Sequence, residues 1–155
     1  MRAKLMIVSA IALLFAGCAG MEKSIIHTVD ENTFFVEVED FDLTNAKVLD
    51  LEGAGGEKAV VLQDETSKAQ ATIKLSKGSY EISVYGLAPS YDEDAFNVTV
   101  GGNEQQRMWI ESPEEILPTL EYVALTQEAD GPCDIVITYI EPNVELDRVE
   151  FKHVQ

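Results

Sequence analysis

The clearest structural signal in this chain is the segment Lys77-Gly78-Ser79-Tyr80-Glu81-Ile82-Ser83-Val84-Tyr85. Tyr80, Ile82 and Val84 alternate with polar residues, and this period of two predicts a strand with one face against a core. Residues 69–75 and 96–100 repeat the alternation on either side. Gly101-Gly102 follows the second of these runs and predicts a hairpin turn. The centre of the chain is therefore predicted to form antiparallel strands.

Short β-rich runs continue outward from this centre toward both ends of the chain. They lie at residues 34–39, 48–51, 59–62, 135–140 and 144–151. No window has a sustained helical period. Closely spaced short strands with turn signals between them predict an all-β domain, a jelly-roll β-sandwich over residues 33–155. We expect its first strand to lie near its last, because that pairing closes the sandwich.

Composition narrows the possible functions. The 155 residues suit one domain, and a hydrophobic content of 46% is enough to bury a core. Lys plus Arg number 11 against 28 Asp plus Glu, which gives a net charge of −17. Such an acidic chain is not expected to bind nucleic acid or to attach to anionic lipid by charge. Two cysteines exclude a disulfide-dense scaffold.

The N-terminus has the layout of an export signal. Arg2 and Lys4 precede an apolar run over residues 5–16, and Gly17-Cys18 follows. Twelve apolar residues are fewer than the ~20 that span a membrane as a helix. Removing residues 1–17 takes away two basic and no acidic side chains, so the remainder carries 9 against 28, a net −19.

The junction at residues 14–18 is similar to a bacterial lipobox. The similarity implies that Cys18 is lipidated, becomes the mature N-terminus and anchors the protein to a membrane of the cell envelope. The alternative is an ordinary signal peptide with an incidental cysteine. We therefore expect a signal peptide at 1–17, a tether at 18–32 and the β domain at 33–155.

Four segments in order resemble the galactose-binding-like jelly roll of bacterial carbohydrate-binding modules, in the group that includes families 6 and 35. They are the opening strand at residues 36–41, the strand at 77–85, the strand and turn at 94–102, and the closing strand at 143–151. The resemblance implies a β-sandwich that binds a polysaccharide or another glycan without catalysis. Asp130-Gly131-Pro132-Cys133 departs from the usual pattern of these modules.

Glu37 and Glu39 lie two residues apart, so on a strand they would point the same way. Two carboxylates on one face repel each other unless a cation or solvent separates them, and Ca²⁺ prefers such oxygens. In the resembled modules the opening-strand pair and a closing-strand Asp hold a structural Ca²⁺, and Asp147 matches that third ligand. The alternative is that both Glu side chains lie on a solvated face.

Aromatic faces against C–H surfaces and planar polar groups against hydroxyls are the chemistry of sugar recognition. The candidate sugar-binding residues are Tyr91, Asp94, Arg107, Trp109 and Asn143. In the resembled modules the loop before the last strand, which holds Asn143 here, often carries a ligand-binding Asn. Core packing is the alternative for Trp109, and a solvated acidic loop is the alternative for Asp94.

Enzyme signals are weak. His27 and His153 lie near the two ends of the predicted domain and do not suggest a triad, and no catalytic or phosphate-binding motif is present. The sequence therefore predicts a non-catalytic glycan-binding module on an exported lipoprotein. The alternative is a structural or protein-interaction β-sandwich with a degenerate sugar site, because one fold serves both purposes.

Overall fold

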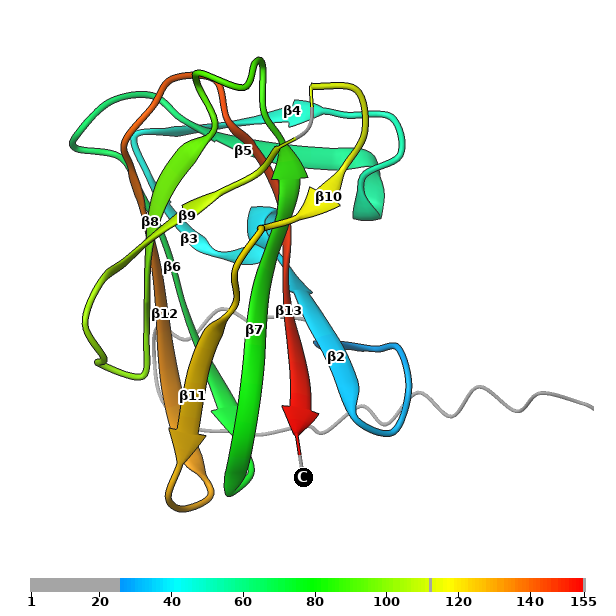
Figure 1. The fold of residues 1–155 in the computed structure, drawn as a ribbon, viewed down its shortest axis with the longest axis vertical. Helices are drawn as coiled ribbons and strands as arrows, with labels where there is room; N and C mark the ends of the chain where they lie inside the picture. The colour runs from blue at the N-terminus through cyan, green and yellow to red at the C-terminus, as the bar shows by residue number, and fades with distance from the viewer. Residues whose placement is uncertain (1–25, 112, 155) are drawn as a thin grey trace, which may run out of the picture.

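The computed structural model describes residues 26–111 and 113–154 as two antiparallel β-sheets packed face to face (Figure 1). This confirms the predicted jelly-roll β-sandwich. The predicted signal peptide at 1–17 and Cys18 lie outside the described residues. Among the described residues, no helix is long and apolar enough to cross a membrane.

The larger sheet is built around the C-terminal strand β13 (Glu145–Val154), which pairs with β7 (Gly78–Leu87) along one side. On its other side β13 pairs with β2 (Thr33–Glu37) through residues 148–152 and with β5 (Lys58–Leu62) through residues 145–146. The remaining strands of this sheet are β1 (Ile26–Thr28), β4 (Ala46–Asp50), β10 (Leu117–Pro118) and β11 (Val123–Gln127). The pairing of β2 with β13 confirms that the first strand of the predicted domain lies beside the last.

The smaller sheet has the order β3-β6-β12-β8-β9. Its strands are β3 (Asp42–Thr44), β6 (Lys68–Leu75), β8 (Ala95–Val100), β9 (Gln106–Trp109) and β12 (Gly131–Tyr139). The β8–β9 hairpin turns through Gly101 and Gly102, which have φ of 60° and 74°. Glycine adopts this left-handed backbone without steric cost, so the Gly-Gly signal for a turn is confirmed.

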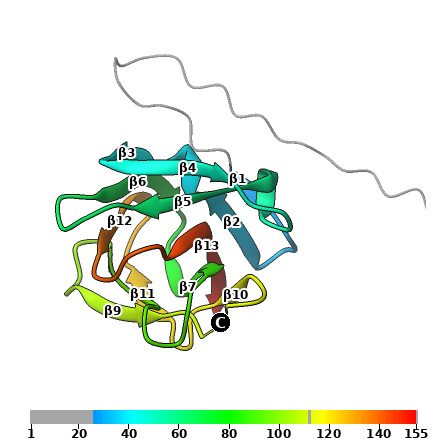
Figure 2. The same cartoon turned by 90° about the horizontal axis from the view of Figure 1, so that it is seen from above.

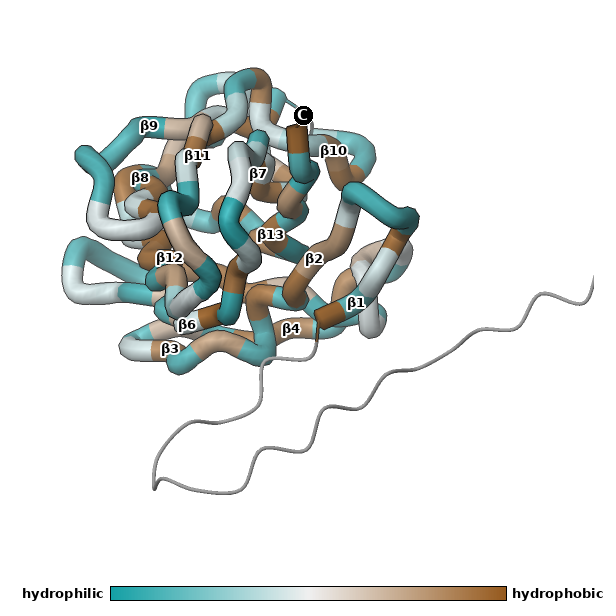
Figure 3. The backbone as a smooth tube through the Cα atoms, turned by 90° about the horizontal axis from the view of Figure 1, so that it is seen from below, coloured by the Kyte–Doolittle hydropathy of each residue, from teal (hydrophilic) through white to brown (hydrophobic). Residues whose placement is uncertain are grey.

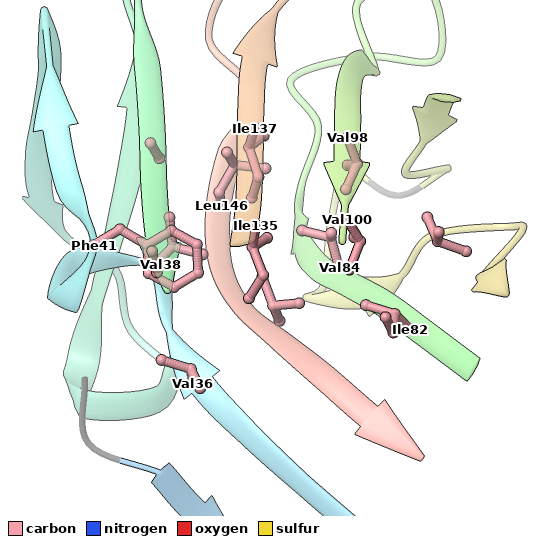
Figure 4. Packing of buried hydrophobic residues seen from close by; sticks show 14 of the residues in the cluster. Val36, Val38, Phe41, Ile82, Val84, Val98, Val100, Ile135, Ile137 and Leu146 are labelled. Carbon is pink, nitrogen blue, oxygen red and sulfur yellow. The ribbon is translucent and has the colours of Figure 1, made fainter. Parts of the chain in front are cut away.

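The core lies between the two sheets, as the view from above in Figure 2 shows. The inward positions of each strand alternate with outward ones, so β6 buries Ala69, Ala71, Ile73 and Leu75. Side chains from both sheets interdigitate there, with Ile135 and Ile137 of β12 facing Val84 and Leu146 (Figure 4). The colouring in Figure 3 shows the same alternation along the chain.

Two local features differ from the expectations. Residues 26–28, which were expected to belong to the tether, form β1 and pair with β2, because an edge strand satisfies the backbone groups of β2. The segment expected to be one strand over 34–39 ends at Glu37, and a 3₁₀ turn, η1 (Val38–Asp40), follows it. Glu37 and Glu39 therefore do not share one strand face.

Candidate functional site

Three acidic side chains that are far apart in the sequence meet at the edge between β2 and β13. Glu37 is the last residue of β2, Glu39 lies in η1, and Asp147 comes from β13. We call these three residues the carboxylate cluster. Glu37 is opposite Arg148 in the pairing of β2 with β13, so the neighbouring Asp147 lies close to it.

A β-bulge in β13 aims Asp147 into this cluster. The register of β13 against β7 shifts between Leu146 and Arg148, so Asp147 is an extra residue in the strand. A bulge breaks the strict alternation of faces and re-aims the side chain at that position. Leu146 and Asp147 are consequently both buried, and Asp147 has no exposed surface at all.

A glycine loop covers the carboxylate cluster. The Asp147 Oδ1 atom accepts a hydrogen bond of 2.7 Å from the backbone N–H of Gly55. A Cβ atom on Gly55 would collide with the Glu37 carboxylate, and one on Gly56 would lie 2.9 Å from the Glu39 Oε1 atom. The sequence therefore needs glycine at both positions so that the backbone approaches the acids this closely.

The carboxylate cluster is desolvated and short of partners. The Oε2 atoms of Glu37 and Glu39 are buried and accept no hydrogen bond. Burial raises the pKa of Glu37 to about 7, and the negative charges of Asp147 and Glu39 add to the rise. Burial also raises the pKa of Glu39, and it raises that of Asp147 against the opposing effects of the Gly55 hydrogen bond and of Arg148. Negative charge here is costly without a nearby cation.

Arg148 is the cation in direct contact with the cluster. Its guanidinium lies 2.8 Å from the Asp147 Oδ2 atom and also stacks over two rings, 4.1 Å from the centroid of Tyr85 and 5.3 Å from that of Phe35. Sequence reasoning missed Arg148, although its position next to Asp147 at the end of an acidic segment was a usable signal.

The three carboxylates of the cluster do not form a complete set of metal ligands. Over residues 26–111 and 113–154, no group of three or more His, Cys, Asp or Glu side chains is already arranged to hold a metal ion. The unpartnered Glu37 and Glu39 oxygens are nevertheless the hard donors that Ca²⁺ takes. The cluster thus contains carboxylate oxygens of the kind that Ca²⁺ takes, although the three acids are not arranged around one point.

A second group of polar side chains lies at one end of the smaller sheet. The Glu141 Oε2 atom accepts hydrogen bonds of 2.8 Å from the backbone N–H groups of both Asp94 and Ala95. Its Oε1 atom accepts one of 3.1 Å from Arg107, whose guanidinium lies 5.5 Å from the centre of the Trp109 ring. We call Asp94, Arg107, Trp109 and Glu141 the tryptophan rim.

The tryptophan rim unites three of the five predicted sugar-site residues. Arg107 and Trp109 are on β9, and Asp94 comes just before β8, where Ala95 pairs with Trp109. Asp94 is buried, not part of a solvated loop; burial raises the pKa of its carboxyl, and the Glu141 charge adds to the rise.

The other two predicted residues lie on loops. Tyr91 is 68% exposed in the loop between β7 and β8. Asn143 is exposed between β12 and β13 with a φ of 63°. Among the described residues, the Tyr91 ring does not stack on the Trp109 ring. Their place in a sugar site therefore stays a prediction.

Sequence reasoning missed two exposed apolar side chains beside the tryptophan rim. The backbone N–H of Leu120 donates a hydrogen bond of 3.0 Å to the carbonyl of Trp109, which places Leu120 beside β9 and Tyr122 two residues further along the chain. Leu120 is 60% and Tyr122 52% exposed. The chain segment between β10 and β11 carries no strand or motif signal, so only the fold reveals this neighbourhood.

Comparison with known proteins identifies the fold. The sequence matches no family model and no curated protein. Solved structures do match it. One is the CBM36-1 domain of a multidomain xylanase from the hindgut metagenome of Trinervitermes trinervoides, with a TM-score of 0.61 and 13% identity over 80% of this chain and 99% of that one. This match spans a whole carbohydrate-binding module.

Two fungal enzymes match with similar quality. A Podospora anserina GH26-CBM35 β-(1,4)-mannanase gives a TM-score of 0.68 with 18% identity over 81% of this chain. An exo-β-1,3-galactanase from Phanerochaete chrysosporium gives 0.65 with 16% identity over 77%. The matched part is only 28% and 29% of these two chains. The likeness therefore establishes a fold that carbohydrate-binding modules share.

Proposed function

We propose that this protein is a non-catalytic glycan-binding module, exported and held at the cell envelope by a lipid on Cys18. The observation that carries the binding function is the tryptophan rim. There a partly buried indole lies beside a guanidinium, and the Glu141 carboxylate fixes that guanidinium through a 3.1 Å hydrogen bond.

This arrangement matches what a sugar ring requires. An indole face packs against the C–H surface of a pyranose, and a guanidinium supplies up to five N–H donors to hydroxyl oxygens. The Arg107 side chain is 49% exposed, so its donors are accessible, while Glu141 limits the rotamers that it adopts. Holding the polar group in place reduces the entropy lost on binding.

We also propose that the carboxylate cluster binds a structural Ca²⁺ through Glu37, Glu39 and Asp147. The buried, unpartnered oxygens of Glu37 and Glu39 support this proposal, because a divalent cation would neutralise charge that Arg148 alone leaves uncompensated. The ion has a structural role and no catalytic role in this proposal. The ion would tie β2, η1 and β13 together and hold the glycine loop.

Titration tests the glycan proposal. Oligosaccharides of neutral and basic composition are titrated while the emission of the single Trp is followed, and calorimetry repeats each titration. We expect dissociation constants in the micromolar to millimolar range, about −8 to −4 kcal/mol. Trp109→Ala and Arg107→Ala should each weaken binding, and Phe35→Ala, an aromatic truncation on the larger sheet, should not. If no glycan gives heat or a spectral change, the protein-interaction alternative replaces this proposal.

The lipid anchor is tested separately by cell fractionation. Wild-type protein should stay with the membrane fraction through a high-salt wash, and Cys18→Ser should release it. Each buried methylene of an acyl chain contributes ~0.8 kcal/mol, so two or three chains hold the protein stably. Equal retention of both forms would contradict lipidation at Cys18.

A further inference from the structure

A cavity of about 470 Å³ opens at the end of the sandwich opposite the tryptophan rim. It lies between the β1–β2 turn, the β6–β7 turn and the last residues of β13, all at the lower end of the view in Figure 1. The pairing of β12 with β6 runs between the two ends of the sandwich, with Gly131 opposite Leu75 at the cavity and Thr138 opposite Lys68 toward the rim. We call this cavity the hairpin pocket. Its size is that of an ordinary small-molecule site.

The charged residues of the hairpin pocket come from two separate parts of the chain. The β1–β2 turn contributes Asp30 and Glu31, the C-terminal end of β6 contributes Lys74, and the β6–β7 turn contributes Lys77. Across the described residues, neither acid forms an ion pair with Lys77. The four formal charges sum to zero (two acids and two lysines) on a chain whose net charge is −17. The pocket therefore presents two charged walls of opposite sign.

Hydrogen bonds hold both walls in place. The backbone N–H of His153 donates to the Asn32 carbonyl at 2.7 Å, and the N–H of Asn32 donates to the Asp30 Oδ1 atom at 2.8 Å. On the other wall, the N–H of Lys77 donates to the Asp130 Oδ1 atom at 2.7 Å. The turns are thus preorganised and do not need to fold around a ligand.

Aromatic side chains also line the pocket. Phe34 stacks on Phe151 of the core with ring centres 5.0 Å apart. Tyr80 meets His153 edge to face at 5.1 Å, and its hydroxyl donates to the Ser76 carbonyl at 3.0 Å. The stack on Phe151 holds the Phe34 ring, and the His153 contact and the Ser76 hydrogen bond hold the Tyr80 ring. They offer a rigid apolar surface to the short carbon linker of a ligand.

We propose that the hairpin pocket binds a small zwitterion, with its ammonium group toward Asp30 and Glu31 and its acidic group toward Lys74 and Lys77. A purely anionic ligand is repelled by the net charge of the molecule and by one wall. A purely cationic ligand is repelled by the lysines and finds acidic sites elsewhere on the surface. Only a ligand that carries both charges gains from both walls.

Phosphoethanolamine has this chemistry, and it occurs both as a free solute and as a lipid headgroup. The lipid source rests on the proposed lipidation of Cys18. From Cys18 to Ile26 the chain has eight steps, which span at most about 26–29 Å when fully extended. Ile26, the first residue of β1, itself lines the pocket, so a lipid anchor on Cys18 would keep the pocket within reach of headgroups.

Calorimetry with the purified full chain tests the proposal. Phosphoethanolamine is compared with ethanolamine, which carries only its ammonium group, and with inorganic phosphate, which carries only its acidic group. We expect phosphoethanolamine to bind about tenfold more tightly than either half, since each half meets one favourable and one unfavourable wall. Equal binding of phosphoethanolamine and phosphate would overturn the zwitterion assignment, as would the absence of any heat.

Charge-reversal variants locate the site. Lys77→Glu and Glu31→Lys should each weaken phosphoethanolamine binding about tenfold, because they reverse one exposed charge without removing a backbone hydrogen bond. Lys47→Glu is the matched control, since it makes the same charge change on the distant edge strand β4. Equal weakening by Lys77→Glu and Lys47→Glu would show a general charge effect and overturn the site.

Vesicles distinguish the two sources. Sedimentation with phosphatidylethanolamine vesicles, but not with pure phosphatidylcholine vesicles, assigns the ligand to a headgroup if Lys77→Glu abolishes it. Binding of soluble phosphoethanolamine without any vesicle preference assigns a free zwitterion. Trp109→Ala should leave all of these binding results unchanged. A failure of the zwitterion proposal is therefore distinguishable from a failure of the glycan proposal.

Discussion

Replacing Glu37 by Gln should stabilise the protein in the absence of divalent cations and abolish its response to Ca²⁺. In the folded protein the pKa of Glu37 rises from its ordinary 4.5 to about 7, chiefly because the carboxyl is buried. Only 6% of the residue is exposed, so solvent does little to screen this effect. Gln keeps the shape of the side chain and removes the charge that burial penalises.

The magnitude and sign follow from that pKa. Below pH 4.5 the carboxyl is protonated in both the folded and the unfolded state, and no penalty exists. As the pH rises toward 7 the unfolded state loses this proton first, so the free energy of unfolding falls. Above pH 7 the full penalty is about 3 kcal/mol, because each pKa unit between 4.5 and 7 corresponds to about 1.4 kcal/mol.

The assay is thermal unfolding in EDTA and in Ca²⁺ at pH 5 and pH 8. In EDTA the wild type should melt at a temperature on the order of 10 °C lower at pH 8 than at pH 5. At pH 8, Glu37→Gln should recover most of this difference. Ca²⁺ should raise the melting temperature of the wild type at pH 8, because a hundredfold excess over its dissociation constant adds about 2.7 kcal/mol to the free energy of unfolding.

Glu65→Gln is the control for this experiment, because it removes one exposed carboxylate that lies away from the cluster. It should change neither the pH dependence nor the response to Ca²⁺. The reasoning is refuted if the wild type in EDTA is equally stable at both pH values, or if Glu37→Gln melts at the wild-type temperature at pH 8. A melting temperature that ignores Ca²⁺, with no metal found by elemental analysis, would refute the cation site alone.

Three further predictions concern the scaffold. Gly55→Ala places a Cβ atom against the Glu37 carboxylate and should remove the Ca²⁺-dependent rise in melting temperature, whereas Gly131→Ala, whose nearest neighbour would be 3.8 Å away, should retain it. Phe151→Ala should lower the free energy of unfolding in urea by about 3–5 kcal/mol, because its fully buried ring leaves a cavity. Cys133 is buried and its thiol pKa is raised to about 11, so in the Cys18→Ser variant absorbance with a thiol reagent at pH 8 should stay flat until urea unfolds the chain.

The strands of this protein were predictable because their signal is local. The alternation in residues 69–75 and 80–85 specifies one buried face at each strand, and β6 and β7 bury those positions. The Gly101-Gly102 pair specified the β8–β9 turn for an equally local reason. The strands β1, β3, β9, β10 and β11 were missed, since runs of two to five residues carry little periodic signal and their pairing depends on neighbours distant in the sequence.

The amino-acid sequence specifies which residue types are available for a site, and the three-dimensional fold brings particular ones together. Glu37, Glu39 and Asp147 were named from a resemblance, yet a bulge in β13 and a glycine loop 92 residues away in sequence place Asp147 among them. The ion pair of Arg107 with Glu141 and the hydrogen bond of Leu120 to Trp109 exist only in the folded chain, because Glu141 and Leu120 lie in loops that the fold brings against β9. Burial and charge proximity are properties of the folded chain, so the raised pKa values and the two-signed walls of the hairpin pocket have no counterpart in the linear sequence.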